Sequence, residues 1–267
     1  MRELPLNLAP LWIERRLGRM HVAFSGRFSW QAIPFIAVKL GFGISYLPEV
    51  TVFANDKDGE MVTLQRSPEE INRNLTRFMR SVRATKSLEI RNSTEALDYS
   101  SVGNLRSLVR LSFFGPISNA IDLSKCYKLE ALVANHRSAS KINGLSDLKR
   151  LKEIHVKNID QKWLDKFPNS LTILYISGSL PKALNFERPK NLDVVAFENV
   201  RTLAFETFSI ETSQASHLII SEVKYITGIE NLKKSFPKTK VIKVKGDSGL
   251  WLSKLMQESD GNIEVIC

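Results

Sequence analysis

The residues of this chain whose types and spacing could bind a metal lie at Asn55–Gly59. Asp56 and Asp58 stand two residues apart before a glycine there, as at the start of a calcium-binding loop. The register of such a loop would place Ala54 at the first ligand position and Gln65 at the twelfth, where acidic side chains are required. We therefore interpret the segment as a hairpin turn that binds no metal.

The other residue types that support catalysis are scattered along the chain. No histidine belongs to an HExxH motif or a closely spaced pair, and no G-x-S-x-G, P-loop or G-x-G-x-x-G motif is present. The histidines are His21, His136, His155 and His217. Cys126 stands where we expect core leucines, and with Cys267 as the only other cysteine there is no disulfide framework. The sequence thus predicts no enzyme activity and no cofactor.

One short pattern recurs eight times between Thr85 and Lys245, about once every 22 residues. The first slot of each copy holds Thr85, Leu108, Leu129, Leu151, Leu171, Leu192, Ala215 and Thr239. The second slot, three residues later, holds Leu88, Leu111, Leu132, Ile154, Leu174, Val195, Leu218 and Ile242. The third slot, two residues further on, holds Ile90, Phe113, Ala134, Val156, Ile176, Phe197, Ile220 and Val244. Such a period predicts a stacked solenoid, because no single copy can bury its own apolar face.

The pattern resembles the leucine-rich repeat, whose core is L-x-x-L-x-L-x-x-N. The most specific stretch is GLSDLKRLKEIHVKN, from Gly144 to Asn158. The asparagine of the repeat stands one place early, at Asn92, Asn158 and Asn199, and is absent from the other copies. The resemblance implies an α/β fold: a leucine-rich-repeat solenoid with a curved parallel sheet and with short helices and loops on its back.

A repeat stack needs atypical ends that cover its open core edges. We expect a mixed, β-rich N-terminal cap over residues 1–84, the solenoid over 85–246 and a C-terminal helix/strand cap over 247–267. The capping box at 67–70 predicts a helix over 67–82.

Short-range alternation predicts the remaining elements of the two caps. A hairpin is expected where residues 22–24 and 28–30 alternate around Ser25-Gly26, and a second where 50–54 and 61–64 flank the turn 55–59. The C-terminal cap is expected to hold a helix over 250–258 and a strand over 263–266.

On each predicted strand, the residues between the core slots point to the concave side of the solenoid. Several of them are aromatic, charged or large and apolar, and such residues dominate the energetics of protein interfaces. The predicted partner-binding residues are Arg110, Phe114, Asn135, Glu153, His155, Lys157, Ile173, Tyr175 and His217. A bare sheet surface is the alternative interpretation.

The net charge of +10 is the strongest surface signal. A basic cluster lies near the C-terminal end and consists of Lys224, Lys233, Lys234, Lys238, Lys240, Lys243 and Lys245. It could attract nucleic acid, an acidic membrane surface or an acidic protein, or it could simply keep the protein solvated. Only Tyr225 and Phe236 lie nearby as aromatic residues, and nucleic-acid grooves normally add stacking aromatics.

These observations favour a non-catalytic, cytoplasmic module that captures or neutralises a protein partner through its concave face. An immunity protein for a cognate toxin is one version, and an adaptor or regulator is another. The first residues mix glutamates and arginines with apolar residues, unlike a secretory signal, and the apolar stretch 32–50 is interrupted by a lysine and two prolines. Nucleic-acid or ribonucleoprotein binding through the basic cluster is the alternative function, and it should weaken steeply with salt.

Overall fold

The structure is a computed structural model of the chain. It describes residues 12–16, 19–25, 32–47, 54–55, 61–62, 76, 79–80, 82–90, 96–134, 137–186, 189–208, 214–246, 251–258 and 263–266. The chain divides into two compact units. We call Met1–Gly144 the N-terminal unit and Leu145–Cys267 the C-terminal unit. The boundaries between solenoid and caps, after residues 84 and 246, remain a prediction.

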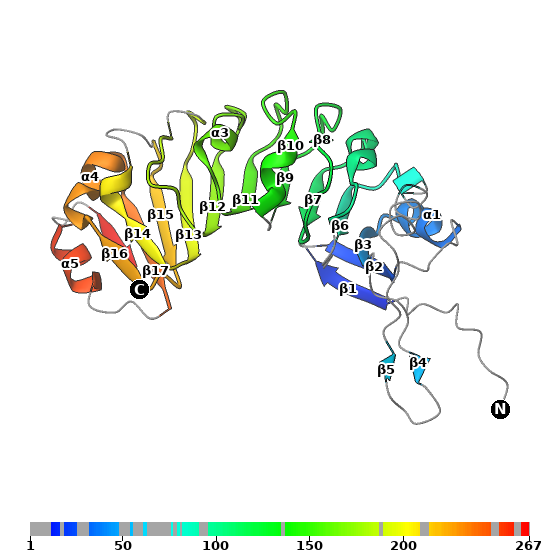
Figure 1. Cartoon of the computed structure of the whole chain (residues 1–267), viewed down its shortest axis with the longest axis horizontal. Helices are drawn as coiled ribbons and strands as arrows, with labels where there is room; N and C mark the ends of the chain where they lie inside the picture. The colour runs from blue at the N-terminus through cyan, green and yellow to red at the C-terminus, as the bar shows by residue number, and fades with distance from the viewer. Residues whose placement is uncertain are drawn as a thin grey trace. The chain divides into compact units, whose positions relative to one another are not determined.

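Parallel strands build the main sheet of the N-terminal unit (Figure 1). In spatial order they are β1 (Trp12–Arg16), β2 (Arg19–Ser25), β3 (Gly43–Leu47), β6 (Ser87–Ile90), β7 (Arg110–Phe113) and β9 (Ala131–Ala134). Only β1 is antiparallel to its neighbour among these strands. On the loop side, β8 (Ile121–Asp122) pairs in parallel with β10 (Ile142–Asn143), and 3₁₀ helices cover Ser100–Asn104 and Arg137–Lys141.

The repeat register extends upstream of the copies recognised in the sequence. Val22 aligns with Ile44, and Ile44 aligns with Leu88, across parallel strands. The predicted hairpin between 22–24 and 28–30 is therefore wrong: β2 already has β1 on one edge and β3 on the other, so neither edge is left for a further partner. Segment 28–30 itself lies outside the described residues.

Other predictions for the N-terminal cap have mixed outcomes. The second hairpin is confirmed, with β4 (Ala54–Asn55) antiparallel to β5 (Met61–Val62). Of the helix predicted over 67–82, Thr76, Met79 and Arg80 are helical and Val82 already lies in a turn, while most of the rest lies outside the described residues.

Helix α1 (Ala32–Lys39) was not predicted, although it lies within the apolar stretch noted in the sequence. Gly41 follows it with a φ of 84°, a conformation that glycine adopts without a steric cost. The amide of Gly41 donates to the Val38 carbonyl and that of Phe42 to the Ala37 carbonyl, which is the Schellman ending of a helix.

Every described strand of the C-terminal unit's main sheet is parallel to its neighbours (Figure 1). They are β11 (Glu153–Lys157), β12 (Ile173–Gly178), β13 (Val194–Val200), β15 (His217–Ser221), β17 (Val241–Lys245) and β18 (Glu264–Ile266). Behind them lie the parallel pair β14 (Thr202–Ala204) and β16 (Tyr225–Thr227), helices α3 (Gln161–Leu164), α4 (Leu232–Ser235) and α5 (Trp251–Glu258), and 3₁₀ helices over Phe205–Thr207 and Ile229–Asn231. The helix and strand predicted for the C-terminal cap are confirmed by α5 and β18.

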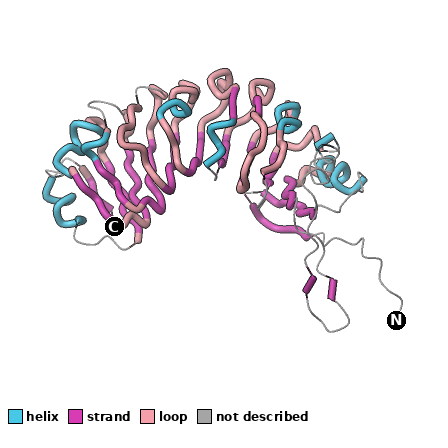
Figure 2. The backbone as a smooth tube through the Cα atoms, viewed as in Figure 1, coloured by secondary structure: helices cyan, strands magenta, loops and turns pink. Residues whose placement is uncertain are grey.

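The core lies between the main strands and the layer of loops and short helices, which Figure 2 distinguishes by colour. Every predicted second-slot and third-slot residue is buried, and the described strand pairs align slot with slot. Full burial of one such side chain contributes about 1.5–3 kcal/mol, so the shared core holds each stack together. The α/β parallel solenoid fold expected from the leucine-rich-repeat resemblance is thus confirmed.

Two of the first slots hold threonine instead of leucine, and both hydroxyl groups are satisfied. Thr85 Oγ1 donates to the Ser87 carbonyl at 2.9 Å, and Thr239 Oγ1 donates to the Ala215 carbonyl at 3.1 Å. A buried hydroxyl without such a partner would destabilise the fold, so these bonds make a polar residue tolerable in an apolar slot.

The displaced asparagines mark a turn that follows the strands of the C-terminal unit. Its residues have left-handed backbone conformations, and they are Asn158, Gly178, Asn199, Glu222 and Gly246. Asparagine and glycine tolerate positive φ, which explains why these types stand here, one place earlier than in the leucine-rich-repeat pattern. Asn158 Oδ1 also accepts hydrogen bonds from the amide of Ser179 at 2.8 Å and from its hydroxyl at 3.0 Å.

Candidate functional site

The outward sheet face of the C-terminal unit consists of the side chains on β11 to β17 that alternate with the buried slots and so point away from the core. Strand register aligns them in three rows. The first row is Glu153, Ile173, Val194, His217 and Val241. The middle row is His155, Tyr175, Ala196, Ile219 and Lys243, and the third is Lys157, Ser177, Glu198, Ser221 and Lys245.

An aromatic pair lies in the middle row. The rings of His155 and Tyr175 are stacked, with centroids 4.0 Å apart and planes 14° from parallel. His155 Nε2 also lies 2.6 Å from Glu153 Oε1, and about a third of each of these two side chains is exposed. The stacked pair of His155 and Tyr175 is therefore held in a fixed conformation and is still partly exposed. Fixed side chains lose less conformational entropy when a partner binds them.

Tyr175 lies in a half-buried and locally acidic environment. Its phenol pKa is raised above the ordinary value, first by burial and then by the negative charges of Glu153 and Glu198. The hydroxyl thus keeps its proton and can donate a hydrogen bond to a partner.

Apolar side chains continue across the face from the aromatic pair, and charged side chains lie beside the pair and on β17. Ile173, Val194, Ile219 and Val241 are half-buried, whereas Lys157, Lys243 and Lys245 are exposed. Ala196 has no exposed surface, so its larger neighbours close over it. An apolar, aromatic centre inside a charged rim is the usual composition of a protein-binding surface.

The outward face of the N-terminal unit is different. Arg110 and Phe114 are half-buried, and predicted Asn135 lies outside the described residues. Neighbouring Ser87, Glu89 and Ser112 are buried. The sequence places these three in the exposed rows, so that expectation is wrong at these positions, and this face offers little accessible surface there.

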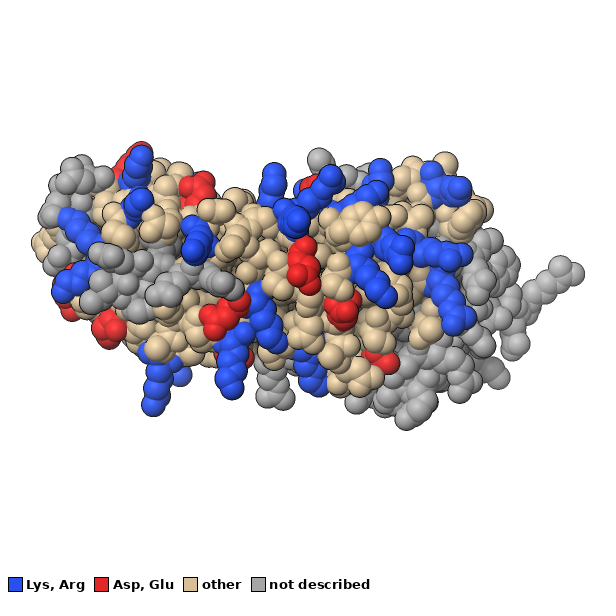
Figure 3. Space-filling view, turned by 90° about the horizontal axis from the view of Figure 1, so that it is seen from above, with Lys and Arg blue, Asp and Glu red and all other residues tan. Residues whose placement is uncertain are grey.

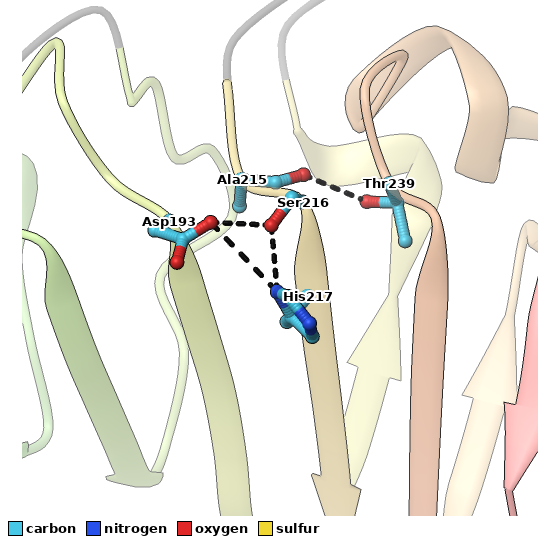
Figure 4. A network of polar contacts seen from close by, with 5 residues as sticks. All are labelled: Asp193, Ala215, Ser216, His217 and Thr239. Atoms are coloured by element: carbon cyan, nitrogen blue, oxygen red, sulfur yellow. Dashed lines mark hydrogen bonds and ion pairs between the residues drawn. The ribbon is translucent and has the colours of Figure 1, made fainter.

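His217 belongs to a polar network at the start of β15 (Figure 4). Ser216 Oγ donates to Asp193 Oδ1 and lies 2.6 Å from His217 Nδ1, while that nitrogen lies 3.7 Å from the same carboxylate oxygen. The hydroxyl proton points to the carboxylate and not to the imidazole, whereas a serine nucleophile needs the imidazole to take its proton. Asp193 and His217 are also about half exposed, with 59% and 49% of their side chains accessible. The network orders the edge of the face and gives no nucleophile.

The basic cluster does not form one patch. Lys243 and Lys245 lie on the outward sheet face, but Lys233 and Lys234 are exposed on α4. This helix lies on the core side of the sheet, because Phe236 at its end contacts Phe197, an inner residue of β13. Lys224 precedes β16, and Lys238 and Lys240 precede β17. On the face shown in Figure 3, lysine and arginine side chains are dispersed over the described surface.

Three features of the surface were missing from the predicted site. Ile219 and Glu198 belong to the same rows as the predicted residues, and their spacing in the repeat already indicates this position. The third feature consists of exposed apolar side chains in the N-terminal unit, Phe35 and Ile36 on α1 and Leu40 directly after it.

Residue types that could react are shielded or dispersed in the part of the chain that the structure describes. Cys126 is fully buried, as its core interpretation predicts, and its Sγ lies 3.8 Å from the carbonyl oxygens of Val102 and Gly103. Burial, with the nearby charge of Asp122, raises its pKa to about 11. No group of three or more His, Cys, Asp or Glu side chains suited to a metal occurs among the described residues. No helix described is long and apolar enough to cross a membrane.

The sequence matches no family model and no curated protein. Among solved structures, the chain is similar to an internalin C2 from Listeria monocytogenes, with 14% sequence identity and a TM-score of 0.39. The comparison covers 70% of this chain and 87% of that one.

Proposed function

We propose that this chain is a non-catalytic leucine-rich-repeat protein that binds another protein through the outward sheet face of its C-terminal unit. One observation carries the proposal: the stacked and partly exposed pair His155–Tyr175 lies among half-buried Ile173 and Ile219. Large, rigid aromatic side chains at the centre of an interface contribute most of its binding energy.

The surrounding charges fit a supporting role. Lys157, Lys243 and Lys245 are exposed at the edge of the apolar centre. Charges at a rim mainly steer association and select partners, whereas the buried centre sets the dissociation rate. The overall charge of +10 favours a partner with acidic regions during the encounter.

Capture or neutralisation of a partner in the cytoplasm is the proposed use of this face. Masking of a cognate toxin, as immunity proteins do, is one form of it, and adaptor or regulatory binding needs the same surface chemistry. Nucleic-acid binding through the basic cluster is the weaker candidate, because Lys234 and Lys243 lie on different sides of the main sheet and so do not line one groove.

The proposal is tested with the partner isolated by affinity capture on the intact chain. Tyr175→Ala should weaken the affinity by about 2 kcal/mol, roughly 30-fold, because it removes the aromatic centre. Combined Gln substitution of Lys233, Lys234, Lys238 and Lys240 is the comparison and should change mainly the association rate and salt dependence. Melting curves establish that each variant folds. Unchanged affinity in Tyr175→Ala, with loss of binding in the lysine variant, would overturn the proposal.

A further inference from the structure

The surroundings of Tyr175 specify the chemistry of what binds there. In the strand register, Glu153 and Glu198 lie at diagonally opposite corners around Tyr175, one on β11 and one on β13. Diagonal neighbours on a sheet lie about 7–8 Å apart, within reach of long side chains. A group placed against Tyr175 can therefore be approached by Glu198 and by Glu153, whose Oε1 also lies 2.6 Å from His155 Nε2.

The other two corners around Tyr175 hold Lys157 and Val194. The four corners thus carry two carboxylates, one ammonium group and one apolar side chain. The raised pKa of the Tyr175 phenol agrees with this balance, because both glutamates contribute to it. In a chain with a net charge of +10, this is a local negative region.

The ring of Tyr175 is stacked on one side by His155, and on the other side its neighbour in the row is Ala196, the smallest side chain of that row. Because larger neighbours cover Ala196 itself, a partner group reaches Tyr175 from the solvent side, at the part of its side chain that stays exposed. An aromatic ring attracts a cation within about 6 Å of its centroid, most strongly where water is excluded.

We propose that the partner places an arginine side chain against Tyr175, between Glu153 and Glu198. The inference rests on the proposed function and names the group that the face recognises. Arginine fits better than lysine, because its planar guanidinium stacks on aromatic rings and has five N–H donors that can reach two carboxylates at once. Ile173 and Ile219 border this position with half-buried apolar surface for the partner residues next to the arginine.

The test uses the intact chain and four blocked peptides, acetyl-Gly-Leu-Xaa-Leu-Gly-amide, with arginine, lysine, glutamine or glutamate as Xaa. Binding is followed by the NMR shifts of the Tyr175 ring, assigned with Tyr175→Phe. We expect the arginine peptide to bind about tenfold more tightly than the glutamine peptide, with lysine between them and glutamate weakest. Glu198→Gln should remove most of the arginine preference, and Glu153→Gln should reduce it.

Glu264→Gln provides the matched control. Glu264 is exposed on β18, aligned with the first row, but several strands away from Tyr175, so the arginine preference should survive its substitution. Equal binding of the arginine and glutamine peptides would overturn the inference while leaving the proposed function intact, since the face would still bind. An arginine preference that persists in Glu153→Gln and Glu198→Gln would overturn it as well. The proposed function is tested separately, by the partner affinity of Tyr175→Ala.

Discussion

Cys126 and Tyr175 are ionisable side chains that their surroundings hold in the neutral form. Burial is the larger cause for both, and nearby carboxylates add to it: Asp122 for the thiol, Glu153 and Glu198 for the phenol. The consequences differ with location. Cys126 is sealed in the core, where a neutral thiol packs as a small apolar group, whereas Tyr175 keeps a proton that it can donate at a surface.

Cys126 should resist alkylation while the protein is folded. In a Cys267→Ser variant, iodoacetamide at pH 8 should leave Cys126 unmodified for hours, because the thiol is buried and its pKa of about 11 keeps it protonated. Mass spectrometry before and after addition of denaturant measures the modification. Rapid labelling of the folded protein would contradict the core assignment.

Tyr175 should titrate above the ordinary tyrosine pKa of 10.0. Because the folded state holds the phenolic proton more tightly than the unfolded state, this residue's contribution to stability is present below pH 10 and is lost as the pH rises through the folded pKa. Difference absorbance at 295 nm between wild type and Tyr175→Phe isolates the titration. Glu153→Gln and Glu198→Gln should each lower the pKa of the Tyr175 phenol. An unchanged pKa in both variants would show that these two carboxylates do not raise it.

At the scale of single elements, the turn after each strand of the C-terminal unit sets the path of the chain back to the loop side. Gly178 has a φ of 79°, and a Cβ built on it would lie 2.3 Å from Asn158 Oδ1. That oxygen already accepts two hydrogen bonds from Ser179, so it cannot move away without losing them.

Gly178→Ala should therefore destabilise the protein by about 1–3 kcal/mol, through the strained backbone and the clash. Asn199→Gly is the matched control in the next turn, because Asn199 has a φ of 53° that glycine adopts freely, and its effect should be within about 0.5 kcal/mol. Urea unfolding measures both. A Gly178→Ala variant as stable as wild type would mean that the turn differs from the one described.

Period-two burial made one strand in each of the eight copies predictable, because each copy repeats two apolar slots such as Ile154 and Val156. These strands are β6, β7, β9, β11, β12, β13, β15 and β17. A strand at 22–24 was predicted, but the repeat register of β2 and β3 was not, because their first slots, at Arg19 and Gly41, are not apolar and because residues 54–80 interrupt the period. For the candidate site, the rows followed from alternation. Burial of Glu89 and Ser112 could not be foreseen, since it depends on tertiary packing and not on strand geometry.

The arrangement of the basic cluster could not be predicted from the sequence either. Lys234 and Lys243 are close in sequence, yet one lies on α4 and the other on the outward sheet face. Charge composition predicts how many positive side chains are exposed but not which surface they share, because a turn between helix and strand reverses the direction of the chain.

At the scale of the whole molecule, the segment upstream of the predicted repeats supplies strands to the main sheet. β3 pairs with β6 through Ile44 and Leu88, and β2 pairs with β3. Removing these strands would expose one edge of β6 and the buried side chains of Leu88 and Ile90.

Deletion of residues 1–82 should therefore make the protein aggregate or lose cooperative unfolding, because an uncapped repeat exposes apolar surface and an unpaired strand edge. Size-exclusion chromatography and thermal melting provide the measurement. A soluble, monomeric fragment of residues 83–267 with a sharp transition would show that the N-terminal segment is an independent domain.

A protein partner is proposed to bind the outward sheet face of the C-terminal unit. The most direct test of this binding is photo-crosslinking in the source cells, with benzoylphenylalanine in place of Lys243 in one variant and Lys234 in the other. Both lysines are exposed and each substitution removes one positive charge, but only Lys243 lies on the outward face. Binding through the outward sheet face should give a nuclease-resistant, protein-sized adduct from position 243, none from position 234, and loss of the adduct when Tyr175→Ala is added. An adduct from position 234 alone would contradict it.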